Sequence, residues 1–165
     1  MTAFNNIESK IQTLEQAKQT ISEWKENETT VFTNGCFDLL HMGHIDYLSK
    51  ARDLGSKLII GLNSSESVKR LKGPTRPINS IESRSILLAA FEFVDLIIIF
   101  EEDTPINLIS NILPNILVKG GDYNLNTIVG AKEVKKYGGK VKVIPFLKGY
   151  STTNIVTKIQ SFSKR

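Results

Sequence analysis

The sequence of 165 residues contains a single cysteine, Cys36, and no long apolar run. One cysteine excludes an internal disulfide and cannot hold a metal ion by itself. The apolar runs, such as Leu96 to Phe100, are far shorter than a membrane span, and residues 1–10 lack the apolar core of a secretory signal. We therefore expect a cytoplasmic protein with no transmembrane helix and no zinc cluster.

Several phosphate-binding and catalytic signatures are also missing. The chain has no Gly-x-x-x-x-Gly-Lys-Ser/Thr loop, no Gly-x-Gly-x-x-Gly fingerprint and no Gly-x-Ser-x-Gly elbow. These absences count against P-loop kinases, dinucleotide dehydrogenases and serine hydrolases. The formal net charge of +4 suits an anionic ligand, but it does not separate nucleic acid from a phosphorylated metabolite.

Short segments rich in β-branched residues alternate with segments of helical spacing. The expected strands cover residues 30–33, 58–62, 94–100, 116–119 and 141–145. Strands that are apolar on both faces predict a parallel sheet with helices on each side, so we expect an α/β, Rossmann-like three-layer α/β/α fold with a five-stranded parallel sheet. Apolar residues at helical spacing from Ile7 to Trp24 predict an extra helix, so residues 1–28 form an N-terminal helical extension to a domain of residues 29–165.

The loop after the first expected strand contains both histidines of the chain. In an open parallel sheet, ligands bind beyond the carboxyl ends of the strands. The spacing His41-Met42-Gly43-His44 at a helix start places two imidazoles on adjacent turns, and Gly43 leaves room for a phosphate to approach the backbone. Two readings without phosphate stay open: histidines that only pack or cap, and a zinc site with Asp38 nearby.

Three further loops end expected strands and would meet at the same edge of the sheet. The stretch from Lys69 to Pro77 is basic and is expected to form a mobile loop, with Arg84 in the helix that follows, which Asn79 is expected to cap. Lys119 to Tyr123 contains paired glycines, and Gly149 to Asn154 offers hydroxyls at a helix start. Each segment also has an interpretation without a ligand. The first would be a solvated loop, the second a glycine turn and the third an N-cap.

These motifs together resemble the His-x-Gly-His nucleotidyltransferases, and within them the adenylyltransferase of ADP-heptose synthesis. The resemblance runs from about Ile11 to Ile159, and its motifs are residues 33–41, 70–73, 100–105, 118–123 and 151–155. It implies AMP transfer from ATP to D-glycero-β-D-manno-heptose 1-phosphate, with release of pyrophosphate, to form ADP-heptose for lipopolysaccharide core. The family often carries this activity fused to a sugar kinase, for which this chain has no room, so we expect a separate kinase upstream.

The resemblance also implies roles for particular residues. His41, His44 and Lys72 would be catalytic, in a direct attack by the sugar-phosphate oxygen on the α-phosphorus that needs no general base. Mg²⁺ would be bound mainly through the triphosphate, without a protein metal site. Asn63 and Arg76 would contact the sugar phosphate. The expected nucleotide-binding residues are Thr33, Asn34, Gly35, Cys36, Phe37, Asp38, Gly43, Arg84, Gly120, Asp122, Ser151, Thr152 and Thr153.

Alternatives remain at the level of the sequence. Glycerol-3-phosphate cytidylyltransferase, which uses CTP, shares the first motif, but that family has arginines where this chain has Glu92 and the pair Phe146 and Leu147. Lys148 is a candidate replacement for the second arginine. A protein that binds nucleotides or nucleic acid without catalysis is the alternative of another class. We expect no nucleic-acid or membrane partner, and apolar residues at 97–100 would support a homodimer.

Overall fold

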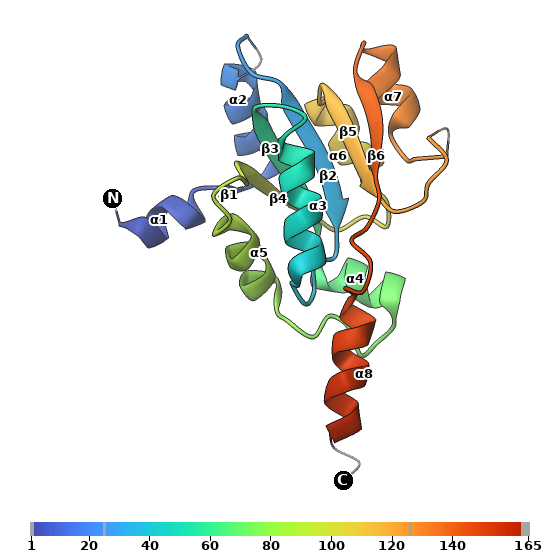
Figure 1. The fold of residues 1–165 in the computed structure, drawn as a ribbon. Coiled ribbons are helices and arrows are strands. Elements are labelled where there is room, and N and C mark those ends of the chain that lie inside the picture. The colour runs from blue at the N-terminus through green and yellow to red at the C-terminus, as the bar shows by residue number, and fades with distance from the viewer. Residues whose placement is uncertain (1, 25, 126, 163–165) are drawn as a thin grey trace.

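The computed structural model describes residues 2–24, 26–125 and 127–162, which form one parallel sheet covered by helices (Figure 1). The sheet order is β1-β4-β3-β2-β5-β6. The strands are β1 Ile11–Gln12, β2 Thr30–Gly35, β3 Lys57–Asn63, β4 Leu96–Phe100, β5 Ile116–Gly120 and β6 Lys140–Ile144. The helices are α1 Ala3–Glu8, α2 Leu14–Trp24, α3 Met42–Arg52, α4 Ser65–Lys72, α5 Ile81–Ala89, α6 Ile106–Ile112, α7 Ala131–Lys136 and α8 Thr152–Phe162.

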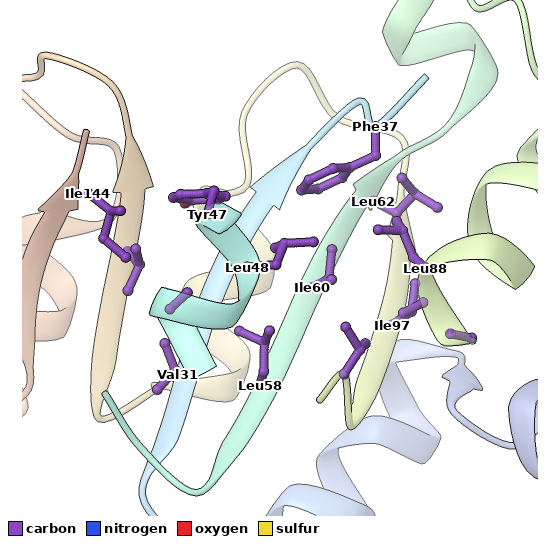
Figure 2. Close-up of a cluster of buried hydrophobic side chains, with 14 of the residues drawn as sticks. Val31, Phe37, Tyr47, Leu48, Leu58, Ile60, Leu62, Leu88, Ile97 and Ile144 are labelled. Atoms are coloured by element: carbon purple, nitrogen blue, oxygen red, sulfur yellow. The ribbon is translucent and has the colours of Figure 1, made fainter. Parts of the chain in front are cut away.

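Two apolar cores, one on each face of the sheet, account for the three layers. In β3, Leu58, Ile60 and Leu62 point to the face covered by α3 and α5, as Figure 2 shows for this core. Ile59, between them in sequence, points to the opposite core, which α2, α6 and α7 cover. Successive side chains of a strand alternate between faces, so a strand buried on both sides must be apolar throughout. The predicted three-layer α/β class with a parallel sheet is confirmed.

The prediction of five strands was wrong, because the sheet has a sixth strand near the N-terminus. In β1, Ile11 pairs with Ile97 of β4. The expected single helix from residue 7 to 24 is therefore divided into α1, β1 and α2. A capping box starts the second helix: the Thr13 hydroxyl accepts from the backbone N–H of Gln16 at 3.3 Å, and the Gln16 side chain accepts from the Thr13 backbone at 3.0 Å.

Two expected boundaries also differ around α4 and α5. Residues 69–72 belong to α4 rather than to a loop, and the helix ends at Gly73, whose φ of 99° is open to glycine without strain. The N-cap of α5 is Ser80, which accepts from the backbone N–H of Ser83. Asn79, expected to cap this helix, instead donates its side-chain amide to the Asp38 carbonyl at 2.7 Å.

The order of the strands fixes where a ligand can enter. From β2 the chain builds β3 and β4 on one side, and then crosses to build β5 and β6 on the other. The loops leaving β2 and β5 therefore diverge, and the crevice between them at the carboxyl edge is where open α/β sheets bind ligands. No helix of the described ranges is long and apolar enough to cross a membrane.

Removing the cap of α2 tests the division of the N-terminal segment. We expect Thr13→Ala to lower the free energy of unfolding by about 1 kcal/mol, because it removes the acceptor for the Gln16 N–H. Urea denaturation of wild type and variant measures the difference. Thr157→Ala, at an exposed position inside α8, is the control and should change stability by less than about 0.5 kcal/mol. Equal effects of the two substitutions would contradict the capping role.

Candidate active site

A cleft of about 660 Å³ lies at the carboxyl edge of the sheet. Its walls come from the loop after β2, from α4, from the segments after β4 and β5, and from the start of α8. Of the predicted site residues, the walls include Asn34, Gly35, Cys36, Phe37, Asp38, His44, Asn63, Lys72, Arg76, Gly120, Thr152 and Thr153. The structure thus brings together residues from four predicted loops that are far apart in sequence.

The two histidines stack on each other at the start of α3. Their ring centroids are 3.9 Å apart, and the centroids of Phe37 and His44 are 5.4 Å apart in an edge-to-face arrangement. His44 Nδ1 accepts from the backbone N–H of His41 at 3.3 Å. This bond leaves the His44 proton on Nε2, so His44 is a hydrogen-bond donor at its other nitrogen. Only His44 of the pair lines the cleft.

Burial keeps both imidazoles neutral at physiological pH. Desolvation and the neighbouring His41 lower the pKa of His44 to about 4, and desolvation lowers the pKa of His41. The ring that faces the cleft therefore acts as a neutral N–H donor rather than as a cation. Such a donor stabilises charge that develops on a phosphate oxygen without binding the ground state as an ion pair.

Gly43 lies between the two histidines but is buried away from the cleft. A Cβ at this position would lie 3.0 Å from His41 Nδ1 and 3.1 Å from Tyr150 Cβ. Gly43 therefore makes room for the His41 ring and for the segment before α8. The sequence predicted a glycine here so that a phosphate could approach the backbone. The structure gives a different reason for the glycine, namely the packing of His41 and Tyr150.

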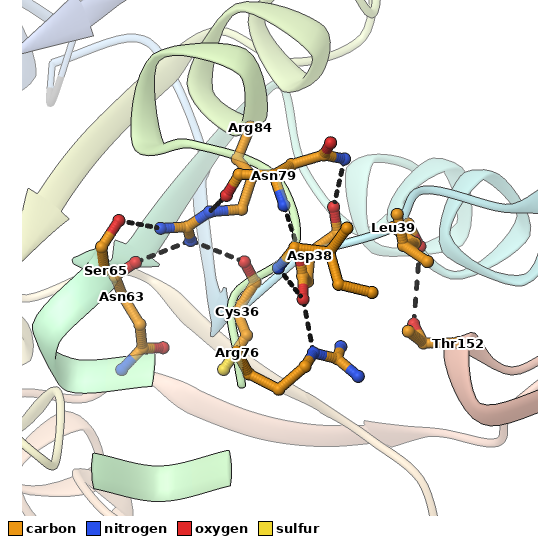
Figure 3. Close-up of polar contacts among 10 residues, drawn as sticks. Cys36, Asp38, Leu39, Asn63, Ser65, Arg76, Asn79, Arg84 and Thr152 are labelled. Atoms are coloured by element: carbon orange, nitrogen blue, oxygen red, sulfur yellow. Dashed lines mark hydrogen bonds and ion pairs between the residues drawn. The ribbon is translucent and has the colours of Figure 1, made fainter. Parts of the chain in front are cut away.

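Asp38 fastens the segment before α5 to the loop after β2 (Figure 3). Its carboxylate accepts from Arg76 Nε at 2.6 Å and from the backbone N–H groups of Ile78 and Asn79 at 2.8 and 2.9 Å. Burial alone would raise the pKa of Asp38, but these three donors hold it below its usual value. Asp38 and Arg76 therefore neutralise each other, and the carboxylate serves mainly to position the loop.

Arg84 is fully buried behind the cleft (Figure 3). Its Nη1 donates to the carbonyls of Cys36 and Asn63, both at 2.8 Å, and its Nε donates to the carbonyl of Asn79 at 3.3 Å. The guanidinium thus joins the ends of β2 and β3 to the segment before α5. Its Nη2 donates to Ser65 Oγ at 3.4 Å. The prediction that Arg84 binds the nucleotide does not fit this placement, because the contacts of the guanidinium are all with protein groups behind the cleft.

The start of α8 is tied to the histidine loop. Thr152 Oγ1 donates to the Leu39 carbonyl at 3.5 Å, and Ser151 Oγ accepts from the backbone N–H of Asn154 at 3.0 Å. Ser151 is thus the cap, whereas Thr152 and Thr153 face the cleft. Further along, α8 has no buried residue and projects from the body (Figure 1).

Other predicted residues lie outside the cleft walls. The Thr33 hydroxyl is buried at 2.6 Å from the Tyr47 hydroxyl, and burial raises the pKa of Tyr47 to about 12. Asp122 is exposed and does not line the cleft, although its neighbour Tyr123 does. His41 also lies outside the walls, where its ring stacks on His44 and its backbone N–H donates to His44 Nδ1.

Sequence reasoning missed several residues that line the cleft. Lys119, Asp103 and Thr104 lie near the ends of β5 and β4, inside the motifs of residues 118–123 and 100–105, but no role was predicted for them. Leu71, Pro105 and Tyr123 also lie inside these motifs or that of residues 70–73. The remaining wall residues belong to no motif and reach the cleft only through tertiary packing. These are Tyr47, Leu117, Thr127, Ile128, Val129 and Phe146.

The model of the family described as cytidylyltransferase-like matches residues 32–158, most of the chain. The chain belongs to the cytidylyltransferase-like family. Within the matched range lie the cleft, both histidines and the carboxyl edge of the sheet, so the family assignment covers the whole candidate site.

Over the aligned region, curated relatives are about 50% identical to this chain. The bifunctional protein HldE of Syntrophotalea carbinolica is 50% identical over 153 residues, which are 92% of this chain and 31% of that protein. The bifunctional protein HldE of Pectobacterium carotovorum subsp. carotovorum is 53% identical over 152 residues, 92% of this chain and 32% of that protein. The chain therefore spans about a third of the length of these relatives.

Solved structures support the same fold. The lipopolysaccharide core biosynthesis protein of Thermoplasma volcanium GSS1 is 29% identical with a TM-score of 0.59, over 76% of this chain and all of that chain. The pantoate-beta-alanine ligase of Francisella tularensis has a TM-score of 0.58 at 17% identity, over 94% of this chain and 79% of that chain. At that identity, the second likeness indicates the fold alone.

The depressed pKa of His44 predicts a loss of stability on the acid side. In the unfolded chain the imidazole takes up its proton near pH 6.5, but in the folded chain only near pH 4. Between these values the unfolded state binds more protons, so stability is full above pH 6.5 and falls as the pH is lowered towards 4. We expect roughly 1 to 2 kcal/mol of this loss between pH 7 and 5, after solvent screening at a partly exposed ring.

Urea denaturation at pH 7, 6 and 5 measures the loss, and His44→Gln should make the dependence shallower. Asp38 does not interfere with this measurement. Because its pKa lies below the usual value, its contribution to the free energy of unfolding is lost only at a pH below the range tested. An unchanged pH dependence in the variant would mean that His44 is not buried in the neutral form.

The Arg84 contacts predict a large cost for removing the guanidinium. We expect Arg84→Met to lower the free energy of unfolding by about 2 to 4 kcal/mol, because three carbonyls lose their donors. Arg70→Met is the matched control, since Arg70 forms an exposed ion pair with Asp103 and its loss should cost far less. Similar losses in both variants would refute the joining role of Arg84.

Proposed function

We propose that the protein transfers AMP from ATP to D-glycero-β-D-manno-heptose 1-phosphate, forming ADP-heptose and pyrophosphate for lipopolysaccharide core synthesis. The observation that carries the proposal is the juxtaposition of the neutral donor His44 with Lys72 and the start of α8 in one cleft at the carboxyl edge. These groups suit a triphosphate. The choice of heptose follows the resemblance in sequence, the HldE relatives and the Thermoplasma protein named for lipopolysaccharide core.

The two ends of the cleft differ in character and suggest how the substrates lie. On the β5 and β6 side, the walls include Leu117, Ile128, Val129 and Phe146, which form an apolar surface suited to a purine. On the β3 and β4 side, the walls are polar and suit a phosphorylated sugar. This side includes Asn63, Lys72, Arg76, Asp103 and Thr104. The triphosphate would lie between these ends, beside His44.

The proposed reaction needs no general base. The attacking atom is an oxygen of the sugar phosphate, which is already an anion at neutral pH. It bonds to the α-phosphorus while the bond from that phosphorus to the bridging oxygen breaks, and the electron pair leaves with pyrophosphate. His44 would donate its Nε2 proton as a hydrogen bond to the triphosphate, and Lys72 would balance charge on the leaving group.

Mg²⁺ is part of the proposal as an ion that enters with the triphosphate. The described residues contain no group of three or more histidine, cysteine, aspartate or glutamate side chains suited to hold a metal. Asp38 is occupied by Arg76 and by backbone N–H groups. This donor set fits a cation held mainly by substrate phosphates, as Mg²⁺ commonly is, and the ion would neutralise charge on the leaving pyrophosphate.

A kinase activity outside residues 1–165 would supply the sugar 1-phosphate, because nothing in the cleft chemistry proposed here phosphorylates a sugar. The HldE relatives are named bifunctional, and this chain matches about a third of each. We therefore propose that the chain performs the second of two consecutive steps, in which a phosphorylated sugar is activated with a nucleotide.

A screen of two nucleotides against two acceptors tests the function. ATP and CTP are each incubated with heptose 1-phosphate or glycerol 3-phosphate and Mg²⁺, and the release of pyrophosphate is measured. We expect release with ATP and heptose 1-phosphate, and a rate at least about a hundredfold lower in His44→Ala, which loses a donor to the transition state. The pair CTP and glycerol 3-phosphate as the best substrates would overturn the proposal in favour of the cytidylyltransferase.

The same preparation separates catalysis from binding of nucleic acid. Filter binding of single-stranded RNA at two salt concentrations should show no retention at physiological salt. Retention that falls steeply with added salt, together with no pyrophosphate release, would favour the non-catalytic alternative.

A further inference from the structure

Lys119 is the last residue but one of β5, at the point where the direction of strand order reverses. Its Nζ donates to Asn34 Oδ1, at the end of the adjacent β2, over 3.2 Å. The same ammonium lies 5.9 Å from the ring centroid of Tyr123. Lys119 therefore bridges the two strands whose loops diverge to form the cleft, and it lines that cleft.

The arginines around the cleft already have partners. Arg76 pairs with Asp38 at 2.6 Å, Arg70 pairs with Asp103 at 2.7 Å, and Arg84 is held by main-chain carbonyls. Lys119 has no ion pair with any residue that the structure describes; its contacts are the neutral amide of Asn34 and the face of Tyr123. A cation at the base of the cleft is thus left without a neutralising anion.

The surroundings of Lys119 make an anionic ligand favourable there. The side chain is half-buried, and burial lowers the pKa of Lys119 because the charged form loses hydration. A partly desolvated ammonium gains more from an anion than an exposed one, since the local dielectric constant is lower. Lys72, the other wall cation without an ion pair among the described residues, is exposed and lies on the opposite side of β2.

Lys119 lies between the apolar end of the cleft and His44, and this position indicates which phosphate of the nucleotide would reach it. If the purine lies against Leu117 and Phe146, the first phosphate after the ribose lies over the ends of β5 and β2, where Lys119 and Asn34 meet. The later phosphates extend towards His44 and α8. We propose that Lys119 is a further catalytic residue, which contacts the α-phosphoryl group during its transfer; this rests on the proposed function.

The chemical role of Lys119 is charge stabilisation without proton transfer. As the acceptor oxygen bonds to the α-phosphorus and pyrophosphate leaves, negative charge grows on the oxygens of the transferred group. The ammonium keeps its three protons and donates one or more as hydrogen bonds to those oxygens. A fixed cation at this place lowers the barrier more than it improves ground-state binding.

A ligand series tests the contact. Calorimetry measures binding of adenosine, AMP and ATP to wild type, Lys119→Met, Lys119→Arg and the matched control Lys72→Met. We expect Lys119→Met to weaken AMP and ATP about tenfold, which is the loss of one charge-assisted hydrogen bond, and to leave adenosine unchanged. Lys119→Arg should restore most of the affinity. Lys72→Met should weaken ATP but not AMP.

Kinetics supply the second measurement. In the pyrophosphate-release assay, Lys119→Met should lower kcat by about a hundredfold or more, with a smaller change in KM for ATP. Thermal unfolding of each variant confirms that the fold is retained. Equal loss of adenosine and AMP affinity, or unchanged AMP affinity, would overturn the proposal. AMP binding needs no sugar acceptor. If heptose 1-phosphate is not the acceptor, the pyrophosphate-release screen shows it, and the AMP-binding test of Lys119 still holds.

Discussion

The buried guanidinium of Arg84 is the interaction on which the candidate site depends. The ends of β2 and β3 and the segment before α5 meet at the carboxyl edge of the sheet, and each presents a carbonyl to the guanidinium. Arg84 donates to the carbonyls of Cys36, Asn63 and Asn79, so it joins these loops through main-chain atoms. A planar guanidinium presents five donors spread over three nitrogens, whereas a lysine offers three donors from a single nitrogen and reaches separated acceptors less well.

The groups that face the cleft follow from that arrangement. With Arg84 and Arg76 occupied in holding loops, the walls keep one neutral imidazole, His44, and the two lysines Lys72 and Lys119. These groups donate hydrogen bonds and carry positive charge, but none is set up as a nucleophile or as a general base at neutral pH. Transfer of a nucleotidyl group to an acceptor that is already anionic requires only such positioning and charge stabilisation.

Much of the fold was predictable because strands that are buried on both faces have short, continuously apolar sequences. The strand β1 was not, since two residues, Ile11 and Gln12, lie inside a pattern of helical spacing, and only the Thr13 to Gln16 capping box marks the break. Most of the site was predictable from motifs at strand ends. The burial of Arg84 was not, because arginine is usually exposed, and Phe146 reaches the cleft only through its packing on Gly120.

The most direct test of the account follows the oxygen atoms of the acceptor. Heptose 1-phosphate labelled with ¹⁸O at its three non-bridging phosphate oxygens is incubated with ATP, and the products are analysed by mass spectrometry and ³¹P NMR. The account predicts an ADP-sugar that retains all three labels, one of them in the bridge between its phosphorus atoms, and pyrophosphate without label. Label in the pyrophosphate, or an ADP-sugar that has lost one label, would contradict attack by the sugar phosphate on the α-phosphorus.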